Sequence, residues 1–473
     1  MLIQLNNIVP VADVRGCEKA SRLFALSRPH TPQAHLFETE YGCHLLMANG
    51  SRVYTISAEI AAQVQRLQNT PEDLVPYLDA LGLESAQYIT EEALPPLPVR
   101  TLSLAIAQKC NLGCTYCYAQ EGQFGGAPKN MPLEVAQAAV ALLLRDTEPG
   151  DRVQLAFLGG EPLINRDALR AATAFAVEAA QTKGVSLGFS ITTNGTLLTP
   201  EDGAFFERHG FAVTISLDGI GATHDSLRPY KNGRGSYEQI LKNVRPLLAL
   251  QRRMQVSARV TVTPSNLCLR ETLDALIALG FHSVGFSPML TSPTGRGEMR
   301  QEDLHVMLEQ MVTCGEEFER QVVADRRYPF QNMLNAMQEM HRGSHRPYPC
   351  GAGAGYFGVS AEGGLFACHR FVGDDVGVMG NVSDGADAER QSRWLAERHV
   401  HRQEPCRSCW ARYLCGGGCH HEVLRRGRPA CDYIRGWLHY CLQAYIRLAE
   451  RKPAFFGVPV ITAPSQTDRP SLS

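Results

Sequence analysis

The sequence lacks the long apolar runs that membrane spans and export signals need. No stretch of the 473 residues approaches twenty consecutive apolar residues, so no transmembrane helix is expected. The first 21 residues interrupt their apolar positions with Asn, Asp, Arg, Glu and Lys, which leaves no continuous apolar core of signal-peptide length. We therefore expect a protein without a membrane partner that stays in the cytoplasm.

The sequence also lacks an excess of charge of either sign. Its 46 Lys and Arg residues nearly balance its 48 Asp and Glu residues, for a formal net charge of −2, and the two signs are interspersed. Without a basic field, electrostatics gives no reason to expect binding to nucleic acid or to an acidic membrane. The length of 473 residues is enough for two or three domains.

Cysteine, in contrast, is abundant and clustered. The chain has fifteen cysteines, and in a reducing cytoplasm they are better explained as metal ligands than as disulfides. Three lie together at positions 110 to 117, and eight lie between Cys350 and Cys441. This clustering predicts metal centres in two separate parts of the chain.

The first group has the spacing C-x3-C-x2-C, formed by Cys110, Cys114 and Cys117 after an apolar run. Three thiolates can hold three irons of a [4Fe-4S] cube, which leaves the fourth iron without a protein ligand. A zinc knuckle is the alternative. A tetrahedral zinc site needs a fourth Cys or His nearby, and none lies within twenty residues on either side.

This spacing, with Tyr116 just before the third cysteine, resembles the signature of the radical SAM enzymes. The resemblance implies that the amine and carboxylate of S-adenosylmethionine (SAM) bind the open iron. It also implies that one electron from the reduced cluster cleaves SAM to a 5'-deoxyadenosyl radical. The cofactor supplies this chemistry, and the protein positions it.

From Val99 the sequence alternates strand-like and helix-like runs, which predicts a parallel βα architecture. Helices are expected from Pro132 to Arg145 and from Asp167 to Thr182, and strands at 101–107, 153–158, 187–191, 212–217, 256–262 and 283–287. Six βα units match the α/β fold of the radical SAM enzymes, a partial (β/α)6 TIM-like barrel. Its chemistry should lie at the carboxyl ends of the strands.

Short polar motifs follow three of these expected strands. They are Gly159-Gly160-Glu161-Pro162, then Thr192 to Thr196, then Ser216 to Gly219. By resemblance, the first holds the methionine amine of SAM, and the others hold its ribose hydroxyls and carboxylate. The implied cofactor-binding residues are Tyr116, Gly159, Gly160, Glu161, Asn194, Ser216, Asp218 and Arg228. A tight turn would explain the glycines of the first motif but not Glu-Pro after them, and the other two motifs, taken singly, are also consistent with ordinary turns. Arg228 could equally brace its loop.

The second cysteine group has an order and spacing that resemble the SPASM domain. It begins as C-x12-G-x4-C and continues, after a gap, as C-x2-C-x5-C-x3-C with one further cysteine. The resemblance implies two auxiliary [4Fe-4S] clusters, and thus three clusters in all. The family's ligand pattern assigns Cys350, Cys368 and Cys419 to the first cluster, and Cys406, Cys409, Cys415 and Cys431 to the second. Cys441 remains an alternative to Cys431, and zinc remains an alternative to the clusters.

The first auxiliary cluster is expected to have an open iron. Some relatives supply a fourth ligand from the interval that here runs from Gly351 to Ala367, and this interval contains no cysteine. The iron stays open unless Cys268, Cys314 or Cys441 reaches it. An open iron favours soft sulfur ligands and can hold the thiolate of a peptide cysteine.

His369, directly after Cys368, distinguishes two reactions of related enzymes. Sulfatase-maturating relatives that make formylglycine typically have an Asp there, which serves as a base. The Cys-His-x-Phe-Val-Gly form resembles the thioether-forming peptide maturases instead. His369 is a candidate base near neutral pH, although a purely structural hydrogen bond explains it equally well.

The resemblance thus implies a radical SAM/SPASM peptide maturase that forms intrapeptide thioether cross-links from cysteine sulfur to carbon. Such enzymes include maturases of Cys-rich, ribosomally made peptides and the maturation enzyme of quinohemoprotein amine dehydrogenase. The expected partners are a cysteine-containing precursor peptide or small protein subunit, and a low-potential electron donor such as flavodoxin or ferredoxin. A formylglycine-forming sulfatase maturase and a non-catalytic iron–sulfur or zinc peptide-binding protein are the alternatives.

Four segments are expected along the chain. Residues 1–95 form an N-terminal module with strands within 35–48 and at 52–56 and with helices beginning after Ser57 and Thr70. This order of elements resembles winged-helix precursor-recognition elements, and a structural cap on the next domain is equally consistent with it. Residues 99–330 form the barrel, 345–448 the SPASM domain, and 449–473 a disordered tail.

Overall fold

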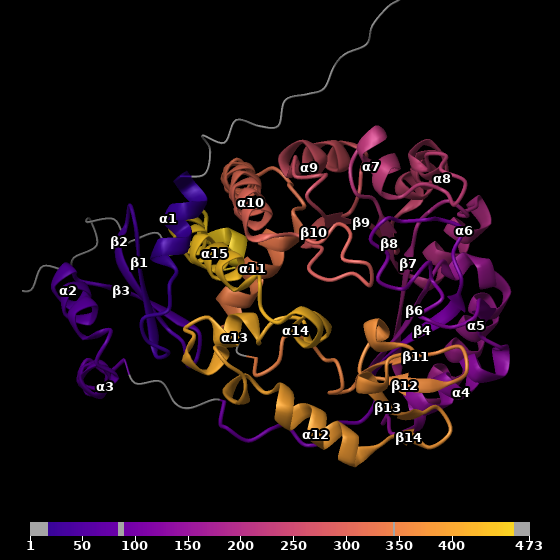
Figure 1. Cartoon of the computed structure of the whole chain (residues 1–473), viewed down its shortest axis with the longest axis horizontal. Coiled ribbons are helices and arrows are strands. Elements are labelled where there is room, and N and C mark those ends of the chain that lie inside the picture. Colours follow the sequence, from indigo (N-terminus) through magenta and orange to yellow (C-terminus); the bar gives the residue numbers. More distant parts are fainter. Residues whose placement is uncertain (1–17, 84–88, 344–345, 458–473) are drawn as a thin grey trace, which may run out of the picture.

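The structure of the chain, a computed structural model, describes residues 18–83, 89–343 and 346–457. Its centre is an 11-stranded sheet in the order β10-β9-β8-β7-β6-β4-β11-β12-β13-β14, with the short β5 (Lys129–Asn130) paired to β4. The order does not return on itself, so the sheet is curved but remains open (Figure 1). Helices cover its outer side.

One half of this sheet is the predicted parallel βα part. All six predicted strands are present as β4 (Thr101–Gln108), β6 (Arg152–Gly159), β7 (Ser186–Thr193), β8 (Ala212–Ser216), β9 (Gln255–Val262) and β10 (Val284–Pro288). Each pairs in parallel with the next. Strand β4 is buried along nearly its whole length, because parallel strands are covered on both faces and therefore read as continuous apolar runs. The partial-barrel fold is confirmed.

Six helices fill the intervals between these strands: α4 (Leu133–Arg145), α5 (Arg166–Lys183), α6 (Pro200–His209), α7 (Ala222–Leu227), α8 (Tyr237–Leu250) and α9 (Leu269–Ala278). The two helices with predicted bounds lie within one residue of them. A 3-10 turn, η2 (Pro162–Asn165), precedes α5. These connections bring the loops that follow the strands to one edge of the sheet.

The other half of the sheet comes from the cysteine-rich region. β11 (Tyr356–Val359) pairs in parallel with β4, and β12 (Gly364–Phe366), β13 (Val378–Asn381) and β14 (Gly385–Ala386) continue antiparallel. The turn η3 (His369–Phe371) folds back over β11, so closely that a Cβ on Gly358 would meet the carbonyl carbon of Cys368 at 2.7 Å. The two cysteine groups are therefore joined by one continuous sheet.

The remaining elements are mainly helical. They are α10 (Gln301–Val323), α11 (Gln331–Arg342), α12 (Ala388–Arg398), α13 (Arg412–Cys415), α14 (His420–Arg426) and α15 (Cys431–Arg451), with the short turns η4 (Asp375–Gly377), η5 (Val400–Arg402), η6 (Cys406–Ser408) and η7 (Pro453–Phe456). Helix α15 lies between α1, α10 and α11 (Figure 1). None of the helices within the described ranges is long and apolar enough to cross a membrane.

The prediction of a disordered tail is wrong for residues 449–457. Helix α15 continues to Arg451, and η7 follows it. Phe455 packs edge-on against Phe318 of α10 at 6.0 Å, and Lys452 pairs with Asp325 at 2.6 Å. The aromatic residues hidden in this polar segment therefore attach it to α10. Residues 458–473 lie outside the described part of the chain.

The N-terminal part contains α1 (Glu18–Leu26), β1 (Ala34–Thr39), β2 (Gly42–Met47), β3 (Arg52–Ile56), α2 (Ala58–Leu67) and α3 (Pro71–Ala80). The predicted strands and helices are present, and the three strands form an antiparallel sheet with β2 in the centre. Ser57 caps α2 as expected, because its side chain accepts a hydrogen bond from the Ile60 amide at 3.3 Å.

This N-terminal sheet is attached to the cysteine-rich region by buried polar contacts. His35 Nε2 lies 2.8 Å from His439 Nδ1 on α15, and the His35 ring stacks on Trp410 at 3.8 Å. The Trp410 indole donates to the Ser27 carbonyl at 2.9 Å. Since Trp410 directly follows Cys409, the N-terminal sheet contacts the loop that carries cysteines of the second group.

Candidate functional site

The first three cysteines lie together in the loop that follows β4. Burial raises the pKa of the Cys110 thiol to about 11 and that of Cys114 to about 12, and neighbouring thiols, with Cys117 next to both, raise these pKa values further. Hydrogen-bond donors surround the sulfurs: the Leu112 amide lies 3.5 Å from Cys110 Sγ, and Arg228 Nη1 lies 3.8 Å from Cys114 Sγ. Three thiols in one loop, with donors to their sulfurs, fit an iron–sulfur cluster, whose binding would deprotonate them.

The glycines of the second motif let the backbone of neighbouring loops approach. A Cβ on Gly159 would lie 2.3 Å from the Ala107 carbonyl oxygen, and one on Gly160 would lie 2.3 Å from that of Lys109. Gly159 has φ +149°, which also disfavours a side chain. The glycines therefore allow this loop to pack closely against the cysteine loop. A contact between these glycines and SAM stays a prediction.

Glu161 is fully buried, and its carboxylate binds the protein itself. It accepts hydrogen bonds from the Leu163 amide at 3.0 Å, the Thr193 hydroxyl at 2.7 Å and the Asn194 amide at 2.7 Å. Burial raises its pKa to about 7, although these donors oppose the shift. Asn194 Nδ2 in turn lies 3.7 Å from Cys110 Sγ. Glu161 thus positions Asn194 beside the first cysteine.

Asp218, Arg228 and Tyr116 form one buried network next to Cys114. Arg228 Nε donates to Asp218 Oδ2 at 2.6 Å, the Tyr116 hydroxyl donates to the same oxygen, and the Thr261 amide donates to Oδ1 at 2.8 Å. The Arg228 guanidinium lies 5.5 Å from the centre of the Tyr116 ring. Burial opposes the charge of Arg228, but Asp218 outweighs it and raises its pKa.

This network changes the interpretation of two predicted cofactor-binding residues. Asp218 is completely buried, and both of its oxygens already accept hydrogen bonds from the protein. Its clearest role is to hold Arg228 beside Cys114. Ser216 ends β8, opposite Arg259 of β9, at the same edge of the sheet. Contacts of these residues with SAM stay predictions.

The three cysteines assigned to the first auxiliary site converge from distant segments. Burial raises the pKa of Cys368 to about 12, and the neighbouring thiols of Cys419 and Cys350 raise it further. Burial also raises the pKa of Cys350, again with Cys419 as a neighbour. Cys368 precedes η3, and Cys419 precedes α14. The three cysteines that the resemblance assigns to one cluster are thus neighbours in the structure, and their role as its ligands stays a prediction.

None of the cysteines considered as a fourth ligand joins this site within the described ranges. Cys441 is buried in α15, where its sulfur lies 3.9 Å from Met333 Sδ. Cys314 is buried in α10 near Arg270 and Asp274, and Cys268 is exposed at the start of α9. Tyr356 lies close to this site instead, because the thiols of Cys368 and Cys350 both help to raise the pKa of its hydroxyl.

His369 is buried beside the first auxiliary site. Its Nδ1 lies 2.6 Å from the Tyr356 hydroxyl, and its ring meets Tyr118 edge-on at 6.0 Å. Burial lowers its pKa to about 3, and nearby Arg370 lowers it further, so the ring is neutral at physiological pH. Its predicted role as a base remains a proposal.

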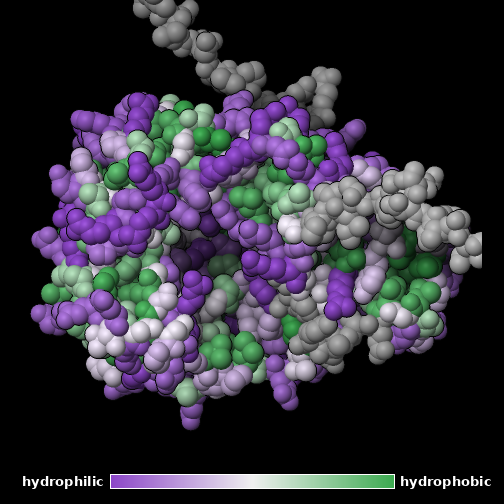
Figure 2. All heavy atoms as spheres, turned by 180° about the vertical axis from the view of Figure 1, so that it is seen from behind, coloured by the Kyte–Doolittle hydropathy of each residue, from purple (hydrophilic) through white to green (hydrophobic). Residues whose placement is uncertain are grey.

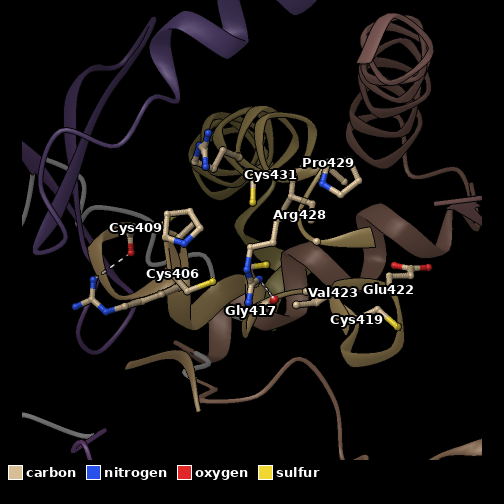
Figure 3. A pocket seen from close by; sticks show the side chains of 18 of the residues that line it. Cys406, Cys409, Gly417, Cys419, Glu422, Val423, Arg428, Pro429 and Cys431 are labelled. Atoms are coloured by element: carbon tan, nitrogen blue, oxygen red, sulfur yellow. Dashed lines mark hydrogen bonds between the residues drawn. The ribbon is translucent and has the colours of Figure 1, made fainter. Parts of the chain in front are cut away.

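The four cysteines assigned to the second auxiliary site line one cavity between η6, α13 and the start of α15 (Figure 3). Burial raises the pKa of Cys406 to about 12, with Cys415, Cys431 and Cys409 as the neighbouring thiols. Cys419 lies at the opposite end of the same cavity, beside Glu422 (Figure 3). Arg428 donates to the Gly417 carbonyl and fixes the wall between the two groups.

Cys431, and not Cys441, belongs to this second group. Cys431 is the first residue of α15, whereas Cys441 lies ten residues further along the helix, about 15 Å away at the rise of an α-helix. No three or more His, Cys, Asp or Glu side chains in the part that the structure describes are arranged to hold a single metal ion. Auxiliary clusters at these groups stay a prediction.

Comparison with known proteins agrees with this geometry. The family model of the Radical SAM superfamily matches residues 104–276, which run from β4 into α9. The chain carries a radical SAM domain. Its three cysteines and the Gly159–Glu161, Asn194, Ser216, Asp218 and Arg228 positions all fall within the matched range.

Relatives of this radical SAM protein include enzymes of protein maturation. The serine-type anaerobic sulfatase-maturating enzyme of Klebsiella aerogenes is 24% identical over 368 residues, which cover 73% of this chain and 86% of that protein. The cysteine-type enzyme of Clostridium novyi is 33% identical over 156 residues, which cover 32% of this chain and 41% of that protein. The protein is thus a radical SAM enzyme with homologues in protein maturation.

Solved structures of low sequence identity share the fold. The structure of native anSMEcpe with bound AdoMet superimposes with a TM-score of 0.62 at 18% identity, covering 76% of this chain and all of that one. At this identity the similarity shows the fold alone. A radical SAM domain implies SAM and one [4Fe-4S] cluster, and Cys110, Cys114 and Cys117 are the residues that fit its cluster.

Three side chains at the centre of the molecule were not predicted from the sequence. Tyr118 directly follows Cys117, Arg370 follows His369, and Glu422 lies on α14. Arg370 contacts both of the others, because its guanidinium lies over the Tyr118 ring and pairs with Glu422. A position one or two residues after a predicted ligand cysteine was the available signal for Tyr118 and Arg370. Glu422 has no such signal, because only the fold brings α14 to η3.

Proposed function

We propose that this radical SAM enzyme forms intrapeptide thioether cross-links, from cysteine sulfur to carbon, in a peptide or small protein. The supporting observation is the first auxiliary site, where Cys350, Cys368 and Cys419 meet and no fourth cysteine joins them within the described ranges. A cluster held by three thiolates keeps one iron for a further sulfur ligand, and the thiolate of a substrate cysteine suits that position.

The residues around the first three cysteines support radical formation. SAM and a cluster bound there would supply a 5'-deoxyadenosyl radical, as in other members of the superfamily. Within this chain, Glu161 fixes Asn194 beside Cys110, and Asp218 fixes Arg228 beside Cys114. In our proposal Gly159, Gly160, Asn194, Ser216 and Arg228 contact SAM, and Glu161 and Asp218 position them. Removal of a hydrogen from the acceptor carbon and closure of the carbon–sulfur bond release one electron, which we assign to the auxiliary sites.

The partners of the proposal are a cysteine-containing precursor peptide and a low-potential electron donor of the flavodoxin or ferredoxin type. Peptide recognition at the N-terminal sheet is supported by β3, an edge strand whose only strand partner among the described residues is β2. A peptide can add to such an edge through backbone hydrogen bonds. The opposite edge strand, β1, packs against α15.

Formylglycine formation is the second candidate, because sulfatase-maturating enzymes are among the relatives over most of the chain. The residue after Cys368 weighs against it. In this chain a neutral histidine held by Tyr356 stands where the resemblance places an aspartate base in sulfatase maturases. The two reactions are separated by what happens to the substrate cysteine: one keeps its sulfur in a new bond, and the other loses it.

The test is anaerobic reconstitution with iron and sulfide, then incubation with dithionite, SAM and a candidate cysteine-containing peptide, followed by mass spectrometry. Thioether closure makes the peptide lighter by two hydrogens and protects its cysteine from alkylation. An aldehyde that reacts with a hydrazide supports formylglycine instead and contradicts the proposal. A colourless protein with stoichiometric zinc contradicts both.

Two variants control this experiment. Cys350→Ala removes a proposed ligand of the first auxiliary site and should abolish cross-linking. Cys268→Ala removes an exposed cysteine that lies at none of the three sites and should keep it. Equal activity of the two variants would show that the first auxiliary site has no part in the reaction.

A further inference from the structure

One arginine connects the first cysteine group with the first auxiliary site. Arg370 lies in η3, two residues after Cys368, and its Nη1 is 2.7 Å from Glu422 Oε1 and 3.8 Å from Cys419 Sγ. The same guanidinium lies 5.5 Å from the centre of the Tyr118 ring, next to Cys117. Arg370 therefore contacts residues of both sites at once.

The guanidinium is charged and only partly neutralised. Its side chain is 17% exposed and that of Glu422 is 16% exposed. An arginine side chain stays protonated in proteins, so the group next to Cys419 is a cation. Its Nε is buried without a hydrogen-bond partner among the described residues. One donor of this arginine is thus left unused by the protein.

The other charges around this pair do not cancel it. Arg259 of β9 faces both Arg370 and Glu422, and its own side chain donates to the Ser287 hydroxyl. His421 neighbours Glu422 on α14, and its ring meets Phe371 edge-on at 5.1 Å. The Arg370–Glu422 pair therefore has a further cation, Arg259, facing it.

We infer that Arg370 is a positioning residue that raises the reduction potential of a cluster held by Cys350, Cys368 and Cys419, and that Glu422 moderates this effect. A cluster gains negative charge when it is reduced, so a nearby cation and N–H donors to its sulfurs favour the reduced form. A carboxylate paired with that cation lowers the reduction potential of the cluster. This inference rests on the auxiliary cluster of the proposed function, but not on the thioether reaction.

The contacts of Arg370 also link the loop of the first cysteine group to the first auxiliary site. Tyr118 packs against the guanidinium, and its ring also meets His369 edge-on. A planar cation stacked on an aromatic ring and hydrogen-bonded to a carboxylate is held in one orientation, which lysine does not reproduce. The loop after Cys117 and the turn after Cys368 are in this way locked together.

The test is a potentiometric titration of the reconstituted full-length protein, followed by electron paramagnetic resonance. The measurements use a triple variant, Cys110→Ala/Cys114→Ala/Cys117→Ala, which lacks the first cluster. The resonance signal that disappears when Cys368→Ala is added to this variant is assigned to the first auxiliary cluster. In this triple variant Arg370→Gln should lower the midpoint potential of that cluster, whereas Glu422→Gln should raise it. Arg370→Lys, which keeps a charge without the planar fork, should recover part of the loss.

Arg425→Gln is the matched control. Arg425 lies on α14 near Glu422 but pairs with Asp374 and is half exposed, and it should leave the midpoint unchanged. A shift of the same sign in Arg370→Gln and Glu422→Gln, or no shift in either, overturns the inference. If Arg370→Gln does not retain its cluster, the sign of the Glu422→Gln and Arg370→Lys shifts still decides.

The outcome of this titration does not depend on whether the enzyme forms a thioether. The midpoint potential is measured without peptide, so opposite shifts support the tuning role even when no thioether is found. An unchanged midpoint in an enzyme that does form the thioether overturns the tuning role alone. Absence of any signal that depends on Cys368 contradicts the auxiliary cluster, and with it both proposals.

Discussion

At the scale of single residues, the protein surrounds its first three cysteines with hydrogen bonds that it satisfies internally. Glu161 and Asp218 have a carboxylate where the resemblance implies contacts to SAM, yet each is fully buried and binds backbone amides and neighbouring side chains. Their effect is to place Asn194 next to Cys110 and Arg228 next to Cys114. Motifs identified the right place in the sequence, but only the fold shows which side chains face the cysteines.

The Asp218–Arg228 pair gives a prediction about stability. Asp218→Asn keeps the shape of the side chain but leaves a buried guanidinium without its counter-charge, which should reduce the free energy of unfolding by about 3–5 kcal/mol. Urea denaturation followed by fluorescence measures it. Asp146→Asn, in an exposed pair with Arg145, should change the free energy of unfolding by no more than ~0.5 kcal/mol. Equal losses in the two variants would contradict the role given to Asp218.

Single residues also decide between two candidate ligands. Cys431 lies in the cavity with Cys406, Cys409 and Cys415, whereas Cys441 packs against Met333 in the core. Cys431→Ala should therefore lower the iron content of the reconstituted protein by the equivalent of one cluster. Cys441→Ala should keep the full iron content, and iron analysis by colorimetry separates the two. A loss of iron in Cys441→Ala would reverse the assignment.

At the scale of helices and strands, local patterns predicted the barrel strands closely, because parallel strands buried on both faces read as apolar runs. The strands β11 to β14 escaped prediction for a physical reason. They are two to four residues long, and β11 is fixed by pairing with β4, from Tyr356 to Thr101, across more than half of the chain. Short strands held by distant partners leave no periodic pattern of their own.

The close packing of α10 against α15 depends on a glycine of α10. A Cβ on Gly315 of α10 would lie 2.4 Å from Cε1 of Tyr440 on α15. Gly315→Ala should therefore destabilise the protein by about 1–3 kcal/mol through overpacking, although alanine normally favours a helix. Glu316→Ala, at a half-exposed neighbouring position, serves as the control in urea denaturation. A stabilised Gly315→Ala variant would show that α10 and α15 do not pack this closely.

The contact between the N-terminal sheet and α15 should depend on pH. Burial lowers the pKa of His35 well below 6.5 and that of His439 to about 4, so both are neutral in the folded protein. As the pH falls from about 6.5 towards 4, these histidines become protonated in the unfolded chain but stay neutral in the folded protein. Protonation therefore favours the unfolded chain, and the contact loses stability over this pH range. Hydrogen exchange of β1, corrected for intrinsic rates, should therefore increase on acidification.

His439→Gln provides the comparison for this pH effect. It removes one of the two buried titrating groups, so the pH dependence of exchange in β1 should flatten. His341→Gln, at an exposed position on α11, should keep the wild-type dependence. If all three proteins show the same pH profile, the histidine pair does not control the docking of the N-terminal sheet.

At the scale of the whole molecule, the three cysteine groups lie along one path. The first group follows β4, the first auxiliary site lies over β11 next to it, and the second auxiliary site lies beyond α14. Figure 2 shows a deep hollow in the face of the molecule behind the view of Figure 1. A second, polar cavity of about 640 Å³ is lined by Tyr118, Arg370 and His421, which lie near the first two sites.

The grouping of the seven auxiliary cysteines comes from the resemblance to the SPASM domain, and it stays a prediction; in the structure these cysteines lie near one another. The ion pair and the stacking that connect the sites were not predictable, because Tyr118, Arg370 and Glu422 are separated by 252 and 52 residues along the chain. Contacts of this kind depend on the sheet that joins the barrel to the cysteine-rich region. The sequence indicates the chemistry, and the fold determines which residues tune it.

The most direct test of thioether formation follows the fate of one hydrogen. A candidate peptide is prepared with deuterium on the carbons of every residue except cysteine and is incubated with the reduced enzyme and SAM. If a carbon outside the cysteine receives the sulfur, the 5'-deoxyadenosine formed must contain deuterium, by mass spectrometry, in step with the cross-linked product. If 5'-deoxyadenosine contains deuterium only when the cysteine carbons are labelled instead, the enzyme oxidises cysteine and the thioether proposal is wrong.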